Sequence, residues 1–209
     1  MVARPPRVAN AISRKQAESA RGAAAFADAI GLPLNTHVTI NFAYTSLEGE
    51  EAWHAFTRLR TVHFRHWLTY RAKKAKKRYG PPTFLWAWEN APSEVQDRLL
   101  LHVHWAVHVP PELADEFAQQ VLEWVRKIGG QLDESQCVVK VDPATRPRGL
   151  ETYLLKDVDA RYRKHFNIKH FGSYGPTFRK RCSPSQNIGK AARKAWLARQ
   201  NALIEAARA

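Results

Sequence analysis

Residues 100–109, Leu-Leu-His-Val-His-Trp-Ala-Val-His-Val, are the stretch from which the fold can be worked out. Apolar residues dominate this stretch and Pro110 follows it, which is typical of an inner strand of a sheet. Alternate side chains of a strand share a face. One face is therefore apolar, and the other carries the imidazole rings of His102, His104 and His108.

The spacing of His102 and His104 allows both rings to bind one ion. Their Cα atoms lie about 7 Å apart in a strand, whereas His108 lies about 13 Å beyond His104, too far to share that ion, and is given no role. Alternatively, these histidines merely face a groove or solvent. A histidine pair within an otherwise apolar strand favours metal binding.

Composition and charge limit the class of protein. The chain has 209 residues, of which 44% are hydrophobic, enough for one domain with a buried core. Its net charge of +14 favours a polyanionic partner, nucleic acid first and an anionic membrane surface second. Cys137 and Cys182 form no CxxC pair, which fits a reducing, cytoplasmic location. Neither a long apolar run nor a signal peptide is recognisable, so we expect a soluble protein and no membrane partner.

The order of predicted elements indicates the fold class. Alternating β-branched residues predict strands, and apolar residues three or four positions apart predict helices. The elements are a strand at 36–44, a helix at about 49–78, strands at 83–90 and 100–109, a helix at 112–128 and a strand at 136–141. This βαββαβ order predicts an α+β fold of the ferredoxin-like or RRM-like type, with a central antiparallel sheet. Both helices would cover one face, leaving the histidine face free for a ligand.

Two further segments flank the predicted domain at residues 36–160. Residues 1–35 form an N-terminal extension, in which an alanine-rich stretch from about 13 to 30 predicts a helix. This extension could be a docking arm or a basic appendage. Residues 161–209 form a basic, helical C-terminal extension. Lysines at 73, 74, 76 and 77 end the long helix, where they could complement the helix dipole or contact phosphates.

Positive charge is concentrated towards the C-terminus. Residues 146–199 hold 14 Lys or Arg against 3 Asp or Glu, a net charge of 14 − 3 = +11. This segregation predicts a polyanion-binding surface. The interleaved aromatic residues Tyr162, Phe166, Phe171, Tyr174 and Phe178 suit stacking on unpaired bases, or they could pin the segment to the core. The candidate nucleic-acid-binding residues are Arg146, Arg148, Arg161, Arg163, Lys164, Arg179, Lys180 and Arg181.

A third metal ligand is available in Glu89, at the end of the strand before the histidine strand. If the two strands pair, Glu89 could lie beside His102. A carboxylate with two imidazoles makes a three-ligand site with open positions, at which a bound ion could polarise a substrate oxygen. Zinc would also be admissible by ligand type. If Glu89 points elsewhere, the third ligand is a different residue.

A candidate nucleophile follows the fourth strand. Tyr153 and Lys156 lie at i and i+3 of a predicted helix at about 150–158, so both project from one face. A phenol has a pKa near 10 and is a poor nucleophile at neutral pH, but a metal ion and a nearby cation reduce that difficulty. Tyr153 could then attack a phosphodiester in DNA. Alternatively, its ring only packs on the core.

These residues carry a resemblance to a known family through two motifs, His102-Val103-His104 and Tyr153-Leu154-Leu155-Lys156. The first resembles the His-hydrophobic-His motif of HUH endonucleases. The second resembles the YxxK motif of their rolling-circle replication initiator (Rep) branch. The first predicted strand sits where that family has its first motif, and Glu89 matches the acidic ligand. The match spans about residues 36–160.

The resemblance implies a Mg²⁺- or Mn²⁺-dependent nickase that acts on single-stranded or hairpin origin DNA of a plasmid or phage. Tyr153 would form a 5′-phosphotyrosine link, release a 3′-OH and later rejoin the strand. Lys156 would position the scissile phosphate. A separate helicase and DNA polymerase would be its partners. Tyr162, nine residues on, would face the opposite side of a continued helix, so a single nucleophile is expected.

Other classes remain open from the sequence. A mobilisation relaxase places its tyrosine before the histidine motif, which would nominate Tyr44. A single-tyrosine transposase typically has a glutamine where this chain has Lys156 and Asp157. A non-catalytic ferredoxin-like nucleic-acid-binding module would carry stacking aromatics on its sheet, but the glycine-aromatic signature of RNA recognition motifs is absent.

Overall fold

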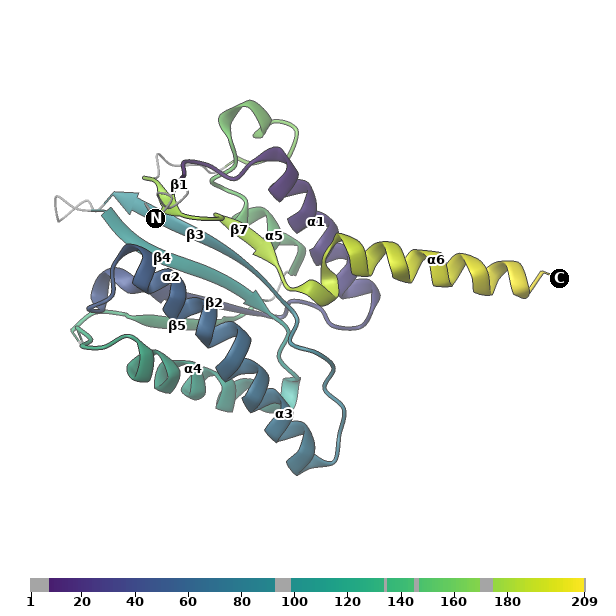
Figure 1. Cartoon of the computed structure of the whole chain (residues 1–209), viewed down its shortest axis with the longest axis horizontal. Coiled ribbons are helices and arrows are strands. Elements are labelled where there is room, and N and C mark those ends of the chain that lie inside the picture. Colours follow the sequence, from purple (N-terminus) through teal and green to yellow (C-terminus); the bar gives the residue numbers. More distant parts are fainter. Residues whose placement is uncertain (1–7, 93–98, 134, 145–146, 170–174, 209) are drawn as a thin grey trace, which may run out of the picture.

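The computed structural model describes residues 8–92, 99–133, 135–144, 147–169 and 175–208. These residues form an α+β fold around a five-stranded antiparallel sheet with the strand order β5-β2-β4-β3-β7 (Figure 1). The predicted α+β class and antiparallel sheet are therefore confirmed. The sheet strands are β2 Thr36–Asn41, β3 Phe84–Pro92, β4 Leu99–Val107, β5 Val139–Pro143 and β7 Cys182–Pro184.

The first four helices fall close to the ranges expected from the sequence, the fifth begins and ends three to four residues earlier than expected, and the sixth lies within the segment expected to be a helical extension. They are α1 Arg14–Ala29, α2 Gly49–Arg58, α3 Phe64–Ala75, α4 Ala114–Ile128, α5 Pro147–Leu154 and α6 Lys190–Ala206. One π-helical turn, Leu59–His63, joins α2 to α3, so the two follow the single helix predicted there. Two short strands, β1 Val8–Ala9 and β6 Thr177–Phe178, pair with each other in a separate ribbon.

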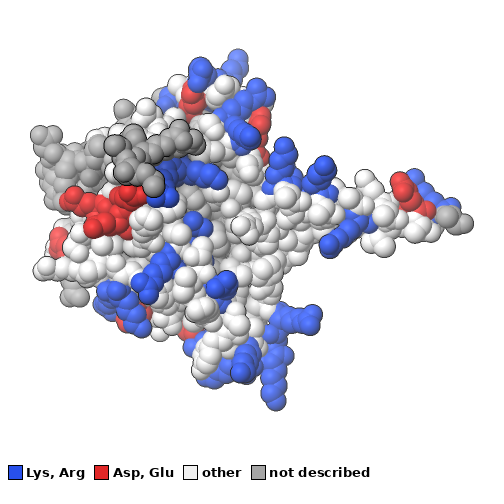
Figure 2. Space-filling view, viewed as in Figure 1, with Lys and Arg blue, Asp and Glu red and all other residues white. Residues whose placement is uncertain are grey.

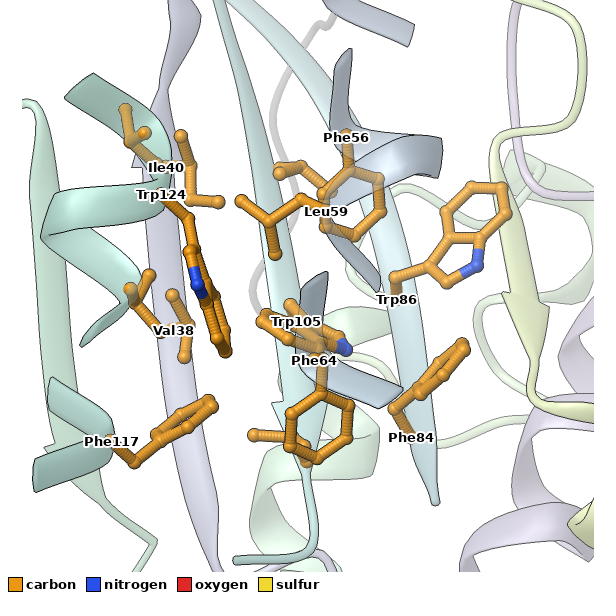
Figure 3. Packing of buried hydrophobic residues seen from close by; sticks show 14 of the residues in the cluster. Val38, Ile40, Phe56, Leu59, Phe64, Phe84, Trp86, Trp105, Phe117 and Trp124 are labelled. Carbon is orange, nitrogen blue, oxygen red and sulfur yellow. The ribbon is translucent and has the colours of Figure 1, made fainter. Parts of the chain in front are cut away.

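The first core lies between the sheet and the helices α2, α3 and α4. Trp105 of β4 is fully buried at its centre. Its ring meets those of Phe56 and Phe64 nearly at right angles, with centroids 5.9 and 5.3 Å apart (Figure 3). Such edge-to-face contacts add to the stabilisation from burying the rings. The apolar side chains that alternate along β4 are thus buried on this face, as the sequence pattern predicts.

The opposite face of the sheet is free only in part, so the expectation that all of it would be free is wrong. Alanines of α1, among them Ala17 and Ala20, are buried in a second core together with Leu85, Ala87 and Ala106 of the sheet. Alanine adds little apolar area per residue, so this helix has a weak sequence signal. Its small side chains nevertheless let the helix approach the sheet closely.

Both terminal segments take part in this fold. Helix α1 begins with a capping box between Ser13 and Gln16, and it covers the second core. Strand β7 pairs with β3 and becomes an outer strand of the main sheet. Helix α6 projects from the body (Figure 1), and Trp196 packs against Phe26 of α1 with ring centroids 5.6 Å apart. The segments expected to be extensions therefore complete the sheet and its second core.

Candidate metal centre and nucleophile

Three side chains predicted as metal ligands meet on the second face of the sheet. Glu89 of β3 is paired directly with His102 of β4, so their side chains share a face, and His104 lies two residues further on that face. One ligand atom from each residue lies within 4.8 Å of the other two. Glu89 and His104 are each 3% exposed. The group could therefore hold a metal ion in a site shielded from solvent.

The donor atoms of this group fit a cation. The Nδ1–H of His102 donates to the carbonyl oxygen of Leu100 at 3.0 Å, which leaves the Nε2 lone pair 2.7 Å from Glu89 Oε2. Nε2 of His104 is buried without a hydrogen-bond partner among the described residues and lies 3.3 Å from the same oxygen. Burial lowers the pKa of both rings, that of His104 to about 3, so the neutral forms are favoured. Neutral imidazoles facing a carboxylate suit a divalent ion.

Thr39 and His37 lie behind His104 and orient its ring. Neither residue was predicted from the sequence to belong to the site. Strand β2 pairs with β4 so that Thr39 lies opposite His104. Thr39 Oγ1 and His37 Nε2 lie 3.1 and 3.2 Å from Nδ1 of His104. Burial, and then the neighbouring His104, lower the pKa of His37 to about 4. A hydrogen bond at Nδ1 selects the tautomer that leaves Nε2 available for a metal.

Lys156 contacts the metal-ligand group directly. Its Nζ lies 2.7 Å from Glu89 Oε1, and both side chains are largely buried. Burial lowers the pKa of Lys156 to about 8. Helix α5 ends at Leu154, so Lys156 lies in the turn that follows and not on the helix as predicted. Its ammonium nevertheless lies 4.0 Å from the ring centroid of Tyr153, so the two residues of the motif stay together.

Tyr153 lies at the metal-ligand group. Its ring centroid is 5.0 Å from that of His104 and 5.5 Å from that of His37. The residue is 43% exposed, so Tyr153 does not belong to the core. Together with His102 and His104 it lines a cavity of about 550 Å³. The histidines and Tyr153 lie in separate segments of the sequence, and the fold brings them to one cavity.

The other tyrosines considered as nucleophiles lie elsewhere. Tyr44 is in a 3₁₀ turn and packs against the first core, on the helix side of the sheet. Tyr162 packs against the second core, with the guanidinium of Arg14 5.9 Å from its ring centroid. His108, which the sequence left without a role, hydrogen-bonds the carbonyl oxygen of Pro33 through Nδ1 at 2.9 Å.

Arg181 was predicted to contact nucleic acid, and this prediction is wrong. The side chain is fully buried and forms an ion pair with Asp157. Its Nη1 donates to the carbonyl oxygens of Ala9 and Gly175, both at 3.0 Å. A guanidinium with several fixed acceptors can be buried without leaving its charge uncompensated. Arg181 therefore joins the two terminal segments and offers no surface to a ligand.

The remaining candidate nucleic-acid-binding residues differ in their ion pairs and in their exposure. Arg161 makes two hydrogen bonds to the carboxylate of Asp159, and Arg179 pairs with Glu50 at 2.6 Å. Arg163 is half-buried, whereas Lys164 and Lys180 are exposed. Arg146 and the side chain of Arg148 lie outside the described residues.

The aromatic residues predicted to stack on bases are only partly described. Phe166 is buried in the second core, which agrees with the alternative that these rings pin the segment to the fold. Phe178 is half-buried and approaches the helix start at Gly49. Phe171 and Tyr174 lie outside the described residues. Among the described aromatic residues of this set, only Tyr162 and Phe178 are partly exposed and could therefore stack on bases.

Comparison with protein-family models, with curated proteins and with solved structures found no match. Within the described part of the chain, every helix is too short or too polar to cross a membrane.

Proposed function

We propose that this protein is a metal-dependent, site-specific endonuclease and ligase for single-stranded DNA, a nickase of the HUH type that initiates rolling-circle replication. The observation that carries the proposal is the placement of Tyr153 against His104 of the ligand group, with ring centroids 5.0 Å apart. The strand order β5-β2-β4-β3 supports the ferredoxin-like part of the expectation.

Glu89, His102 and His104 would hold Mg²⁺ or Mn²⁺, and the ion would stabilise negative charge on the phosphate. The side chains of the cavity have separate tasks. His37 and Thr39 hold the ring of His104 in one tautomer. Lys156 fixes Glu89 from its other oxygen and places a positive charge next to the phenol, which favours the phenolate form of Tyr153.

In the proposed reaction, the hydroxyl of Tyr153 loses its proton to solvent and its oxygen attacks the scissile phosphorus. A bond from Oη to phosphorus forms while the bond from phosphorus to the 3′ oxygen breaks. The leaving 3′ oxygen takes up a proton and becomes a free 3′-OH. The 5′ end stays attached to the protein as a phosphotyrosine, and attack by a 3′-OH reverses the step. No net hydrolysis occurs, so the strand can be rejoined.

A pool of single-stranded oligonucleotides incubated with protein and Mn²⁺ tests this proposal. We expect a covalent adduct whose peptide map gives Tyr153, and no adduct in EDTA. Tyr153→Phe should abolish it, whereas Tyr44→Phe, altered on the other side of the sheet, should form it as the wild type does. His104→Ala should also abolish the adduct but leave strand binding largely intact.

Three other results would each contradict the proposal and identify a different arrangement. Oligonucleotide binding in EDTA, without Mn²⁺ binding or adduct formation under any condition, would identify a non-catalytic nucleic-acid-binding module. An adduct that persists in Tyr153→Phe and disappears in Tyr44→Phe would instead identify the relaxase arrangement. Loss of strand binding together with the adduct in His104→Ala would indicate that the histidines are structural.

A further inference from the structure

A second concave surface lies at the β7 edge of the sheet, between α1, β7 and the start of α6. It encloses about 580 Å³. We call it the α1/α6 groove, and its polar lining residues are Ser13, Lys15, Gln16, Glu18, Ser19, Lys180, Ser183, Lys190 and Arg193. Figure 2 shows Lys and Arg side chains along α6 and on the body where that helix begins. Of the groove residues, sequence reasoning had proposed only Lys180 as a nucleic-acid contact.

The charge of the groove is strongly positive. Four cations, Lys15, Lys180, Lys190 and Arg193, line it together with the single described carboxylate of Glu18. That carboxylate is already paired with Arg14, at 2.8 Å. Within the described part of the chain, none of the four cations forms an ion pair. The groove thus differs from Arg161 and Arg179, whose charges are matched by neighbouring carboxylates.

The groove rests on fixed structure. Its floor is β7, which is hydrogen-bonded to β3, and Gln16 Nε2 donates to the carbonyl oxygen of Cys182 at 3.3 Å. One turn beyond the groove residues of α1, Gly22 interrupts the alanine run of the helix, although glycine is a poorer helix former than alanine. A Cβ at this position would lie only 1.4 Å from Nη1 of Arg193. Glycine therefore lets the guanidinium lie directly against the helix.

We propose that the α1/α6 groove binds the sugar-phosphate backbone of a nucleic acid, at a place separate from the metal centre. Lysine, arginine, serine and glutamine side chains are the groups that proteins use to contact phosphate oxygens. Cys182 pairs with Ala87, and Ala87 with His104, so the groove floor lies two strand spacings from the metal-ligand group, roughly 10 Å. One nucleic-acid molecule can thus reach both places. The choice of nucleic acid rests on the proposed function.

An anionic membrane is the less suitable partner. The groove is concave, and its described lining contains no large exposed apolar side chain. The exposed apolar residues of α6, Leu197, Leu203 and Ile204, lie further along the helix. Membrane surfaces are contacted by protruding faces that insert apolar side chains among the headgroups.

The test compares Lys180→Gln/Lys190→Gln with Arg65→Gln/Lys127→Gln, a control pair assigned to no binding surface. All four side chains are exposed, so neither double variant should disturb the fold, and thermal unfolding checks this. Binding of a fluorescent single-stranded oligonucleotide is measured by anisotropy in EDTA over a range of salt concentrations. Each phosphate contact contributes about 0.7 to the slope of log K against log salt. The groove variant should therefore lose about 1.4 from the slope and bind about 25-fold more weakly at 0.1 M salt.

The control pair should leave both quantities close to wild type. Equal losses in both double variants would overturn the proposal, because they would indicate general charge attraction. A groove variant that binds like wild type, or a wild type that binds no oligonucleotide, would also overturn it. A groove variant that loses binding only to vesicles containing phosphatidylserine would do the same. Adduct formation by the wild type with Mn²⁺ reports on the proposed function separately, since the binding measurements contain no metal.

Discussion

The orientation of His104 can be tested without touching a metal ligand. Thr39→Val removes the hydroxyl that lies 3.1 Å from Nδ1 of His104 and keeps the shape of the side chain. His37→Phe removes the ring nitrogen at 3.2 Å and keeps an aromatic ring next to Tyr153. Each variant alone leaves the other partner for Nδ1. The double variant leaves neither, so the ring loses its tautomer preference and its fixed direction.

The expected size of the effect follows from this redundancy. Loss of a hydrogen bond behind a metal-bound histidine typically weakens metal binding 10- to 100-fold, which is about 1.4 to 2.7 kcal/mol. With one partner remaining, each single variant should weaken metal binding by clearly less than about 10-fold. The double variant should reach about 100-fold, more than the sum of the single effects in free energy. Such non-additivity is expected when two groups serve one function.

Isothermal titration calorimetry with Mn²⁺ measures the dissociation constant of the metal ion for each variant directly. Thr61→Val is the matched control, because it removes a threonine hydroxyl that bonds only the helix carbonyl of Thr57 in the described contacts, away from the cavity. If the double variant binds Mn²⁺ within twofold of the wild type, Thr39 and His37 do not orient His104. If the single effects are already 100-fold each, the proposed redundancy is wrong.

Three further predictions concern stability, each measured by urea unfolding in EDTA. Because the pKa of His37 is about 4 in the fold and about 6.5 when unfolded, its contribution is complete above pH 6.5 and is lost as the pH falls towards 4. The contribution of His37 to the free energy of unfolding should therefore be about 2 kcal/mol smaller at pH 5 than at pH 7, so the stability lost between these pH values should be about 2 kcal/mol smaller in His37→Phe than in the wild type; an equal loss in both proteins would contradict the assignment. Arg181→Met should lose about 3–5 kcal/mol, because Asp157 stays buried without its partner. Arg161→Met, altered in an exposed pair, should stay close to wild type, and equal losses would refute a special role for burial. Trp105→Ala should lose about 3–5 kcal/mol through the cavity it leaves, and a loss near 1 kcal/mol would mean that the first core can collapse around it.

Local patterns predicted what depends on one strand or one helix. The alternation of β4 was enough to place His102 and His104 on one face and Trp105 on the other. The position of Glu89 needed only one further assumption, that consecutive strands pair as a hairpin. These features depend on sequence neighbours, so the chain itself carries the information.

Contacts between distant segments could not be predicted in the same way. His37 and Thr39 reach His104 because β2 and β4 pair in one register, and a shift of one residue would turn both away. A signal was present, since polar residues alternate with buried ones in β2, but the pairing was unknown. Arg181 looked like a surface residue because its sequence neighbours are basic. Its burial depends on Asp157 and on carbonyl groups from both terminal segments.

The placement of Tyr153 is decided by residues that take no part in the chemistry. Leu150, Leu154 and Leu155 are almost fully buried against α1 and the sheet, and this packing sets how α5 lies over the sheet. Tyr153 precedes two of these leucines, so the helix turns its side chain away from the core and towards His104. The same packing faces α1, which sequence reasoning treated as an appendage. Helix α1 therefore supports the candidate nucleophile from the side of the second core, and the packing of that core helps to position Tyr153 at the site.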